Sequence, residues 1–504
     1  MLTEYKTYIH RSDMINCLLC SDAPCSAACP NQVDPAKKLR GIWFGNEKGA
    51  AASFTETCPC VGCYTECESG CIRNGQVPIQ KIMCRLHDEV LHGTDTLSPT
   101  DEERLKTDIC GVPLENPFLL SSSVVASTYD MCARAFEMGW AGAAFKTICN
   151  FEIHEASPRF SAVKSDNNTI VGFKNIEQLS DHSFAENMKI FRELKKKYPS
   201  KVILASIMGQ NEQEWGDLAR QCQDNGADII ELNFSCPNMA EEGLGSDIGQ
   251  VPELVEQLTA RAKAACSIPV IAKLTPNVAS MIPAAEAARR GGADGIAAIN
   301  TIKSVIGVNP YNFVSEPAVH GKSAVGGYSG NAVKPIALRF IDEMASDPNL
   351  TGMDITGMGG IETWVDALEF ILLGCSSVQV TTAVMQYGYR IIDDLKDGLN
   401  RYLNEMNFAS VREAVGLAAG NVYSSTDVLE RDTVLFPKFN REKCVGCGRC
   451  YIACRDGGHQ AIRFGEDRLP KLDGSRCVGC HLCLLVCPQN AISPASKRIS
   501  RQIG

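Results

Sequence analysis

The sequence predicts an α/β protein in which a (β/α)8 barrel, a TIM barrel, stands between two cysteine-rich domains. Three observations carry this prediction. Eight short apolar runs alternate with helical patterns over residues 110–400. Most of those runs end in a polar residue or a glycine. Ten of the 25 cysteines lie between Cys17 and Cys84, and eight lie between Cys444 and Cys487. We therefore expect three domains, with bounds at residues 1–100 (the head), 101–434 (the barrel) and 435–504 (the tail).

Composition and charge exclude several classes of protein. The chain has 504 residues, 45% of them hydrophobic and 21% charged, which is ordinary for a globular protein of several domains. Its net charge of −10 argues against a nucleic acid or an anionic membrane as partner, since both bind basic surfaces. No signal-peptide pattern opens the chain, and it contains no apolar run of about 18 residues. We expect a cytoplasmic protein without a membrane partner, whose clustered, reduced cysteines bind metal or serve in catalysis.

The head contains two cysteine-rich segments. The first reads CLLCSDAPCSAACP at 17–30, and the second reads CPCVGCYTECESGC at 58–71, followed by Cys84. A helix-like segment rich in alanine and lysine, 34–54, separates them. Such spacing predicts metal centres held by thiolates on a small helical domain, with iron–sulfur clusters and zinc as the two candidates.

The barrel is predicted from repeated strand and helix patterns. The candidate strands are 118–122, 141–146, 202–207, 228–233, 269–274, 294–300, 353–360 and 377–382. Helical patterns intervene, for example at 130–139, at 212–227 and within 251–265. Eight such repeats suit a (β/α)8 barrel. A doubly wound sheet is the alternative, but no G-x-G-x-x-G sequence opens a helix in this chain.

The ends of these strands predict a cofactor site, because such barrels place their chemistry at the carboxyl ends of the strands. The residues there are Ser122, Lys146, Thr147, Asn233, Lys273, Asn300, Thr301, Gly359, Gly360, Thr381 and Thr382. Glycines and threonines at the last two ends suit a phosphate held by backbone N–H groups. The two lysines suit the negative charge of a reduced flavin ring. We therefore expect FMN, which exchanges a hydride with substrate and single electrons with iron–sulfur clusters.

The tail contains the spacing C-x2-C-x2-C-x3-C twice, at 444–454 and at 477–487, and Pro488 follows the second run. This is the two-cluster bacterial ferredoxin pattern, in which the fourth cysteine of each run ligates the other cluster. Zinc sites do not repeat this spacing. The ligand sets expected for the two 4Fe–4S clusters are Cys444, Cys447, Cys450 and Cys487, and Cys477, Cys480, Cys483 and Cys454. The glycines expected to let backbone N–H groups approach the sulfurs are Gly446, Gly448 and Gly479.

The body resembles the FMN barrels of dihydroorotate and dihydropyrimidine dehydrogenases over most of 105–400. The matching words are SPRF (157–160), FKNIE (173–177), ASIMG (205–209), ELNFSCPN (231–238), AKLTPN (272–277), INT (299–301), GGYSG (326–330) and GMGGIET (357–363). The head resembles the N-terminal cluster domain of dihydropyrimidine dehydrogenase and the small subunit of glutamate synthase. With the tail added, the resemblance covers nearly the whole chain and is closest to dihydropyrimidine dehydrogenases, particularly their bacterial catalytic subunits.

The head resemblance implies two further 4Fe–4S clusters, which makes four in the chain. It implies Cys17, Cys20, Cys25 and Cys71 for one cluster, and Cys29, Cys63 and Cys67 for three corners of the other. In the family, the last corner is a Gln or Glu a few residues after a proline. Counted from Pro78, that position here is Arg85, which cannot ligate iron. We expect the adjacent Cys84 to replace it, and Cys58 and Cys60 have no expected role.

The barrel resemblance implies a catalytic role for the cysteine that follows the fourth strand. In the family this cysteine is the general acid, so Cys236 would give a proton to C5 of a pyrimidine while the flavin N5 delivers a hydride to C6. A thiol suits this role, because with an unperturbed pKa of about 8.5 it is neutral at pH 7 yet ionises at modest cost. We expect Gly243 and Gly245 to make this loop mobile.

The implied reaction is reduction of the C5=C6 bond of uracil or thymine to the 5,6-dihydropyrimidine. The implied substrate contacts are Asn175, Glu177, Asn233, Asn300 and Thr301, and Gly330 joins the residues around FMN. Amide and carboxylate groups of this kind match the alternating N–H and C=O groups of a pyrimidine base.

The resemblance also bears on the source of electrons. Full-length animal relatives carry an FAD and NADPH region between head and barrel, but here only about 87–105 joins the two. We therefore expect electrons from a separate flavoprotein that binds FAD and NAD(P)H, or from ferredoxin, and a homodimer or hetero-oligomer. Two alternatives stay open: an oxidoreductase of dihydroorotate or another cyclic imide, and an electron-transfer adaptor with an inactive barrel.

Overall fold

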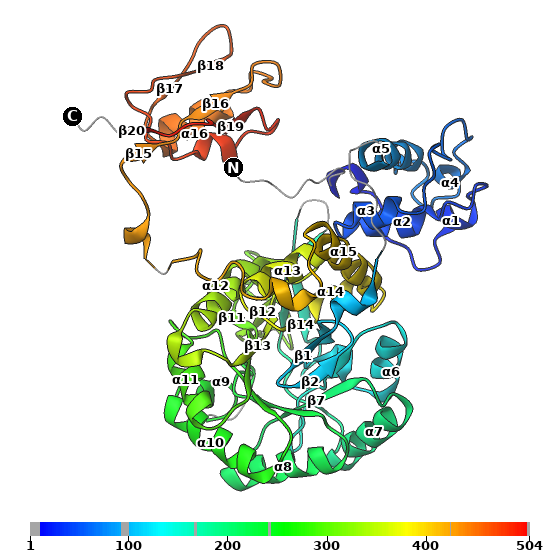
Figure 1. Cartoon of the computed structure of the whole chain (residues 1–504), viewed down its shortest axis with the longest axis vertical. Coiled ribbons are helices and arrows are strands. Elements are labelled where there is room, and N and C mark those ends of the chain that lie inside the picture. Colours follow the sequence, from blue (N-terminus) through cyan, green and yellow to red (C-terminus); the bar gives the residue numbers. More distant parts are fainter. Residues whose placement is uncertain (1–10, 92–99, 166–168, 240–242, 424, 501–504) are drawn as a thin grey trace. The chain divides into compact units, whose positions relative to one another are not determined.

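The computed structural model of the chain describes residues 11–91, 100–165, 169–239, 243–423 and 425–500 (Figure 1). The chain divides into two compact units, and the division along the sequence falls between Val422 and Tyr423. Head and barrel belong to the first unit, and the tail belongs to the second. Among the described helices, none combines the length and the apolar character needed to cross a bilayer.

The head is made of short helices. They are the 3-10 helix η1 (Arg11–Met14), α1 (Pro24–Ala27), α2 (Pro35–Trp43), α3 (Glu47–Ala51), α4 (Glu66–Ser69) and α5 (Ile79–Leu91). The helix-like segment 34–54 therefore forms two helices and not one. Asp34 caps α2 by accepting from the Lys37 N–H, and Asn46 caps α3 by accepting from the Gly49 N–H. Gly45, with φ 71°, makes the turn between them.

A closed barrel of eight parallel strands forms the centre of the first unit, as the sequence predicts. The strands are β3 (Phe118–Leu120), β4 (Gly142–Ala144), β7 (Val202–Ile207), β8 (Ile229–Asn233), β9 (Val270–Lys273), β10 (Gly295–Ala298), β13 (Asp354–Met358) and β14 (Ser377–Val380). Each overlaps one of the eight predicted runs. Nearly every residue of these strands is buried, because the strands face helices outside and packed side chains inside.

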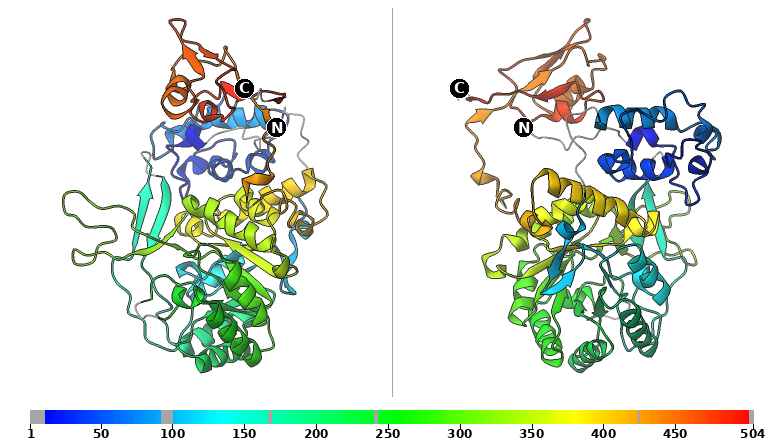
Figure 2. Two further views of the ribbon diagram at one scale, coloured as in Figure 1. Left: turned by 90° about the vertical axis from the view of Figure 1, so that its left-hand side faces the viewer. Right: turned by 45° about the vertical axis from the view of Figure 1, so that its right-hand side comes forward.

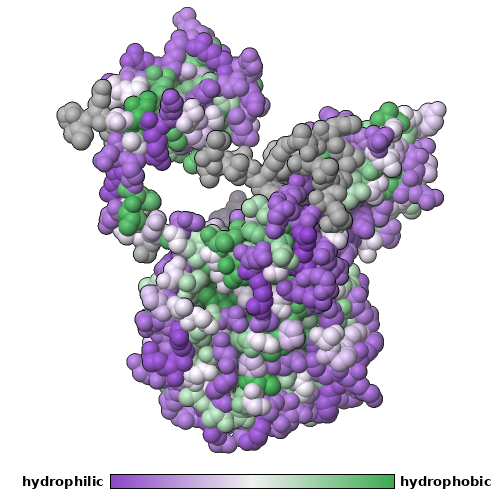
Figure 3. Space-filling view, in the orientation of Figure 1, coloured by the Kyte–Doolittle hydropathy of each residue, from purple (hydrophilic) through white to green (hydrophobic). Residues whose placement is uncertain are grey.

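Helices surround the barrel, with polar residues over much of their outer surface (Figure 3). They are α6 (Tyr129–Glu137), α7 (Phe184–Lys197), α8 (Glu212–Asp224), α10 (Pro252–Ala265), α11 (Ile282–Arg290), α12 (Lys334–Ala345), α13 (Trp364–Leu372) and α15 (Ile391–Glu405), with the short α9 (Ser246–Gly249) and α14 (Thr382–Tyr387). The 3-10 helices outside the head in this unit are η2 (Glu102–Leu105), η3 (Val124–Ala126), η4 (Asn331–Val333), η5 (Pro348–Leu350) and η6 (Val411–Ala414). Capping boxes start α7, at Ser183 and Glu186, and α13, at Thr363 and Asp366.

The two ends of the barrel differ. The antiparallel hairpin of β1 (Thr107–Ile109) and β2 (Val112–Leu114) packs Ile109 and Leu114 into the apolar interior with Leu119, Leu204 and Ile271. At the carboxyl ends stands a four-stranded antiparallel sheet that the sequence reading did not foresee. Its strands are β11 (Ile302–Ser304), β12 (Gly326–Ser329), β6 (Ile170–Asn175) and β5 (Phe160–Lys164). Figure 2 shows the β5–β6 hairpin, in turquoise, standing out from the barrel.

Charged pairs join head and barrel within the first unit. Arg40 of α2 donates to Asp394 of α15 at 2.7 Å, and Lys48 of α3 lies 2.7 Å from Glu405 at the end of α15. The indole N–H of Trp364 donates to the Gly45 carbonyl at 2.8 Å. Because Asp394 is buried, its pKa rises to about 6, and Arg40 opposes that rise. The head is thus anchored on α15, which follows the last strand of the barrel.

The second unit is a small α+β domain. It contains η7 (Thr426–Val428), β15 (Thr433–Val434), β16 (Pro437–Phe439), α16 (Arg449–Gly457), β17 (Ile462–Phe464), β18 (Pro470–Leu472), α17 (Leu482–Leu485), β19 (Ile492–Pro494) and β20 (Ile499–Ser500). Three antiparallel pairs, β15–β20, β16–β19 and β17–β18, hold it together. Each C-x2-C-x2-C-x3-C run is a loop followed by a helix, α16 in the first run and α17 in the second.

Candidate active site

The carboxyl ends of the barrel strands surround one large cavity, with about 1090 Å³ of empty space, part of it open to solvent. Every residue that the sequence assigned to FMN, to substrate or to acid catalysis lines it. These residues are Ser122, Lys146, Thr147, Asn175, Glu177, Asn233, Cys236, Lys273, Asn300, Thr301, Gly330, Gly359, Gly360, Thr381 and Thr382. The fold thus brings together side chains from seven strands and the antiparallel sheet, while the role of each stays a prediction.

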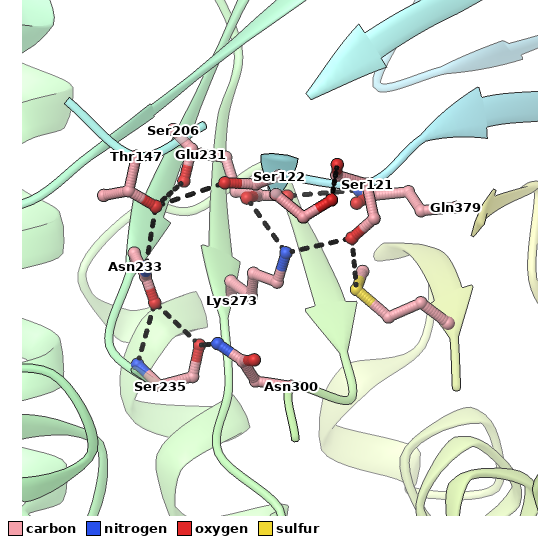
Figure 4. Close-up of polar contacts among 12 residues, drawn as sticks. Ser121, Ser122, Thr147, Ser206, Glu231, Asn233, Ser235, Lys273, Asn300 and Gln379 are labelled. Carbon is pink, nitrogen blue, oxygen red and sulfur yellow. Dashed lines mark hydrogen bonds and ion pairs between the residues drawn. The ribbon is translucent and has the colours of Figure 1, made fainter. Parts of the chain in front are cut away.

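A buried ion pair forms the floor of this cavity (Figure 4). Lys273 Nζ lies 3.3 Å from Glu231 Oε1 and 3.5 Å from Ser121 Oγ. Gln379 Nε2 donates to Glu231 Oε2 at 3.1 Å. Glu231 is fully buried, so among the described residues these contacts compensate its carboxylate. The pair fixes one positive charge at the cavity wall. The strand-end pattern predicts a role for Lys273 but none for Glu231 or Gln379.

A second polar network joins strands β4, β7 and β8 (Figure 4). Asn233 Nδ2 donates to Thr147 Oγ1 at 2.8 Å, and Thr147 Oγ1 also lies 2.9 Å from Ser206 Oγ. Asn233 Oδ1 accepts from the hydroxyl of Ser235 at 2.8 Å, and Asn300 Nδ2 donates to that hydroxyl at 2.9 Å. Such a network holds the amide groups of Asn233 and Asn300 in fixed orientations.

A charged cluster lies at the side of the cavity where the antiparallel sheet begins. Lys146 Nζ lies 3.5 Å from Glu177 Oε1 and 3.8 Å from Glu155 Oε1, and Arg159 donates to Glu177 at 3.2 Å. Burial raises the pKa of Glu177, and Lys146 and Arg159 oppose that rise. Sequence reasoning gave no role to Glu155 or to Arg159, although Arg159 lies within the quoted word SPRF.

Asn238 is another cavity residue without a role in the sequence reading. Its Nδ2 donates to Asn175 Oδ1 at 3.0 Å and to the Glu177 carbonyl at 2.8 Å. Its Oδ1 is buried without a hydrogen-bond partner among the described residues, and so is Oε1 of Gln379. Two orphaned acceptors in one cavity suit a ligand that carries N–H donors, as both a flavin ring and a pyrimidine do.

Cys236 lies at the mouth of β8, with 6% of its surface exposed. Burial raises the pKa of its thiol to about 11, while the Asn238 N–H, Lys146 and Lys273 act in the opposite direction. A Cβ at Gly245 would lie 2.4 Å from the Cys236 carbonyl oxygen, so this turn requires glycine. Gly243 and Gly245 both have positive φ. Residues 240–242 of the predicted mobile loop lie outside the described residues, and its mobility stays a prediction.

Glycines form a cradle on the opposite wall of the cavity. Gly330, Gly359 and Gly360 have φ of 89°, 121° and 83°. A Cβ at Gly360 would lie 2.8 Å from Lys334 Cβ and 3.0 Å from the Gly330 carbonyl oxygen. Threonine hydroxyls line the same wall, with Thr382 Oγ1 3.0 Å from Ser329 Oγ. This backbone-lined wall, together with the lysine on the floor and the orphaned acceptors, fits the phosphate and the ring of FMN.

The tail contains two cavities lined by cysteines. One is lined by Cys444, Cys447, Cys450 and Cys487, and the other by Cys454, Cys477, Cys480 and Cys483. These are the two sets that the crossed ferredoxin pattern predicts. The Ala461 N–H donates to Cys454 Sγ and the Ala491 N–H to Cys487 Sγ, both at 3.3 Å. Four thiols around each hollow, with N–H groups on the sulfurs, fit a 4Fe–4S cluster in each.

The head repeats this arrangement once. A cavity beside α2 and α5 is lined by Cys17, Cys20, Cys25 and Cys71, the first predicted set. The second predicted set is less regular. Arg85, which occupies the family's ligand position, pairs with Glu89 at 2.6 Å and with Asp13 at 2.9 Å. Cys84, the predicted replacement, has its sulfur 3.5 Å from that of Cys58.

Comparisons with known proteins agree with this architecture. A family model of dihydroorotate dehydrogenase matches residues 104–403, and a model of a 4Fe-4S dicluster domain matches residues 438–493. Among solved structures, a dihydroorotate dehydrogenase of Eimeria tenella in complex with ferulenol superposes with a TM-score of 0.53 at 19% identity, over 64% of this chain and 91% of that chain. This likeness concerns the fold.

Sequence relatives are more informative. The NAD-dependent dihydropyrimidine dehydrogenase subunit PreA of Escherichia coli K12 is 52% identical over 362 residues, which are 72% of this chain and 88% of that protein. The chloroplastic dihydropyrimidine dehydrogenase (NADP(+)) of Arabidopsis thaliana is 34% identical over 68% of this chain and 83% of that protein. The catalytic subunit of dihydroorotate dehydrogenase B (NAD(+)) of Pyrococcus abyssi is 37% identical over 62% of this chain and 99% of that protein.

Proposed function

The chain belongs to the dihydroorotate dehydrogenase family, and from that premise we propose that it is the catalytic subunit of a dihydropyrimidine dehydrogenase. It reduces the C5=C6 bond of uracil or thymine to the 5,6-dihydropyrimidine, with FMN in the barrel and iron–sulfur clusters in head and tail. The relatives support an oxidoreductase of pyrimidines, since two of them are named dihydropyrimidine dehydrogenases. We also propose that the domains divide at 100/101 and 434/435, and that the protein is cytoplasmic.

The observation that carries the substrate class is the charge of the cavity. Two of its lining residues, Glu177 and Lys146, are paired with each other, and next to them Glu155 pairs with Lys146 and Arg159 with Glu177. A neutral pyrimidine base needs no added cation, and Glu177 accepts a hydrogen bond from a ring N–H. The carboxylate of dihydroorotate would compete with Glu177 and Glu155 for Lys146 and Arg159, and with Glu231 for Lys273. The cavity therefore favours uracil or thymine over dihydroorotate.

Amide groups of the cavity orient the base. Asn233 and Asn300 are held by the network through Ser235, and Asn175 is held by Asn238. Each amide matches one N–H or C=O group on the edge of the base, and Thr301 adds a hydroxyl. Fixed partners of this kind reject an analogue that lacks a matching group, because a buried amide is then left unpaired.

Cys236 donates the proton. Bound FMN supplies the hydride for C6 of the base. The Cys236 thiol gives its proton to C5, and the thiolate that forms is stabilised by the Asn238 N–H and by the positive charges of Lys146 and Lys273. Because burial holds the pKa of this thiol at about 11, the proton stays on sulfur until C5 takes it.

Electrons come from outside the chain. A separate flavoprotein that binds FAD and NAD(P)H, or ferredoxin, is the expected donor, and the catalytic subunit would work as a homodimer or hetero-oligomer with it. Clusters in the cysteine-lined cavities of head and tail would let electrons enter the chain. Together with a cluster held by the second head set, they would number four. Copurification of the native protein with an FAD-containing partner is the expected result, and ferredoxin-dependent turnover is the alternative.

The direct test is anaerobic turnover with cofactor analysis. The purified chain should release FMN and contain about sixteen irons, as four 4Fe–4S clusters require. With reduced ferredoxin or a reduced viologen dye it should convert uracil to dihydrouracil and leave orotate unchanged. Iron without flavin would instead support an electron-transfer adaptor, and turnover of orotate alone would support the dihydroorotate reaction.

A further inference from the structure

An arginine of the barrel reaches the loop that carries the first predicted set of head cysteines. Arg390 immediately precedes α15, the helix on which the head is anchored. Its guanidinium donates to three backbone carbonyls. Nη1 donates to the carbonyl of Cys20 at 3.1 Å, and Nη2 donates to that of Leu19 at 2.5 Å. Nε donates to the Tyr387 carbonyl at 3.1 Å, so the side chain is held at both ends.

The loop that Arg390 contacts has an unusual backbone. Leu19, between Cys17 and Cys20, has φ 49°, in the left-handed region that is unfavourable for a residue with a Cβ. Each run of the tail has the same conformation at the same place in its C-x2-C, but there the residue is a glycine, Gly446 with φ 65° or Gly479 with φ 73°. Glycine adopts this conformation without strain. A leucine keeps it only where surrounding contacts hold the backbone.

The tail contains an independent parallel to this contact. The Gly446 carbonyl accepts a hydrogen bond from Nη2 of Arg468 at 2.7 Å. Arg468 lies between β17 and β18, so a different structural element supplies the arginine there. In both loops the carbonyl belongs to the residue just before the second cysteine of C-x2-C. The same arrangement on two different folds indicates that it serves what the thiols hold.

Arg390 also brings a permanent positive charge to the loop, because a guanidinium stays protonated in proteins. Its hydrogen-bond partners among the described residues are carbonyls, which leave that charge uncompensated. The neighbouring carboxylates of Asp393 and Asp394 are paired with Arg40, at 3.2 Å and 2.7 Å. A 4Fe–4S cluster gains one negative charge when it accepts an electron. A positive charge beside it therefore stabilises the reduced form and raises its reduction potential.

We propose that Arg390 is a positioning residue of the first head cluster and raises the reduction potential of that cluster. The inference rests on the proposed function, because it requires a 4Fe–4S cluster in the first head set. Arg390 acts in two separable ways. Its hydrogen bonds hold Leu19 in the left-handed conformation, which fixes Cys17 relative to Cys20, and its charge favours the reduced cluster. Through this residue the barrel determines how readily the head accepts an electron.

The effect of the charge is measured by redox titration of the anaerobically purified full chain, followed by electron paramagnetic resonance. The signal that is absent in Cys71→Ala identifies the first head cluster. Arg390→Gln removes the charge and should lower the midpoint potential of that cluster by about 59 mV, which corresponds to a tenfold change for one electron. Arg401→Gln, on the same helix and paired with Asp397 at 2.9 Å, is the matched control and should change no potential. An unchanged potential in Arg390→Gln would overturn the proposal.

Further variants separate charge from conformation. Arg390→Lys keeps the charge but loses the planar fork, so its potential should stay closer to that of the wild type. If Arg390→Gln assembles the cluster poorly, its iron falls from about sixteen toward about twelve atoms per chain. Adding Leu19→Gly should then restore the iron, because glycine needs no support, but not the potential. Recovery of the potential in this double variant would contradict a role for the charge.

The parallel arginine of the tail provides a second control. Arg468→Gln should lower the potential of the cluster lost in Cys444→Ala and leave the first head cluster unchanged. A shift of the head cluster in Arg468→Gln would contradict a local effect of each arginine.

Iron analysis of the wild-type chain separates this inference from the proposed function. About sixteen irons with a head potential that does not respond to Arg390 would overturn the inference alone. About eight irons would refute the head clusters of the proposed function, and the inference with them.

Discussion

The barrel cavity and the tail are both built to hold redox groups, but they are built in different ways. The cavity gathers side chains from strands that lie far apart in the chain, such as Thr147 and Asn233, which share a hydrogen bond of 2.8 Å. The tail gathers its thiols from two short runs within 444–487. Long-range packing therefore positions the chemistry in the barrel, whereas local spacing positions it in the tail. Substitutions in the two places should therefore fail in different ways.

The largest difference is expected for the thiol of Cys236. Cys236→Ala removes the proton donor and should lower turnover of uracil by a factor of about 10² to 10⁴, the range typical of general acid catalysis. Flavin absorbance and iron content should not change, since Cys236 is not part of a cysteine-lined cavity. Cys266→Ala serves as the control. Turnover of Cys236→Ala equal to that of the control would show that the proton comes from elsewhere.

In the tail, a cysteine substitution is expected to lower the iron content and leave the flavin unchanged. Cys487→Ala should remove one cluster and about a quarter of the iron, and leave the FMN in place. If the runs cross, the electron paramagnetic resonance signal that it loses is the one lost in Cys444→Ala, and Cys454→Ala loses the other. The same signal lost in Cys487→Ala and Cys477→Ala would mean that each run holds its own cluster, against the cavities of the structure.

A smaller effect is expected from the floor of the barrel cavity. Glu231→Gln leaves the charge of Lys273 without its partner at 3.3 Å, so the reduced, negatively charged flavin should be favoured. We expect the flavin midpoint potential to rise by about 30 mV, a tenfold change for a two-electron couple. Ser121→Ala, which also removes a contact of Lys273 but no charge, is the control. A potential that falls, or that shifts equally in Ser121→Ala, would contradict this.

For uracil reduction, the smallest effect is expected from pH. The pKa of Cys236 is raised to about 11, and the thiol is the form that donates, so uracil reduction should lose no activity to thiol ionisation between pH 7 and pH 9. Oxidation of dihydrouracil needs the thiolate, so its rate should rise with pH, about tenfold per unit below the pKa. Stopped-flow rates in both directions measure this. A reduction rate that falls through a pKa of about 8.5 would mean that the thiol is not buried in the working enzyme.

The barrel and the tail also differ in how much of each can be predicted from the sequence. In the tail, fixed spacing alone predicts the two sets of four cysteines that line the two cavities. In the barrel, apolar runs and their polar ends gave all eight strands and the residues around the cavity, because strand direction alone brings those ends together. The antiparallel sheet was missed, since its strands interrupt the repeat. Because that sheet was missed, the contacts of Glu155 and Arg159 were missed too. The contacts of Glu231 and Asn238 were also missed, although both residues lie in the segment ELNFSCPN.

The head shows where spacing stops being sufficient. The family resemblance implies its first set of cluster ligands, Cys17, Cys20, Cys25 and Cys71, and these four cysteines line one cavity. Its second set contains six candidate thiols within 29–84, and spacing alone does not rank Cys58, Cys60 and Cys84. The contact between Cys58 and Cys84 is a tertiary fact, which no pattern in the sequence contains.

The most direct measurement is an anaerobic titration of the oxidised protein followed by its visible spectrum. Dihydrouracil is expected to bleach the flavin band and then the broader iron–sulfur absorbance, while dihydroorotate at the same concentration leaves both unchanged. A protein that contains flavin and iron yet is bleached only by dihydroorotate, or by neither compound, would contradict a pyrimidine-reducing barrel connected to iron–sulfur clusters.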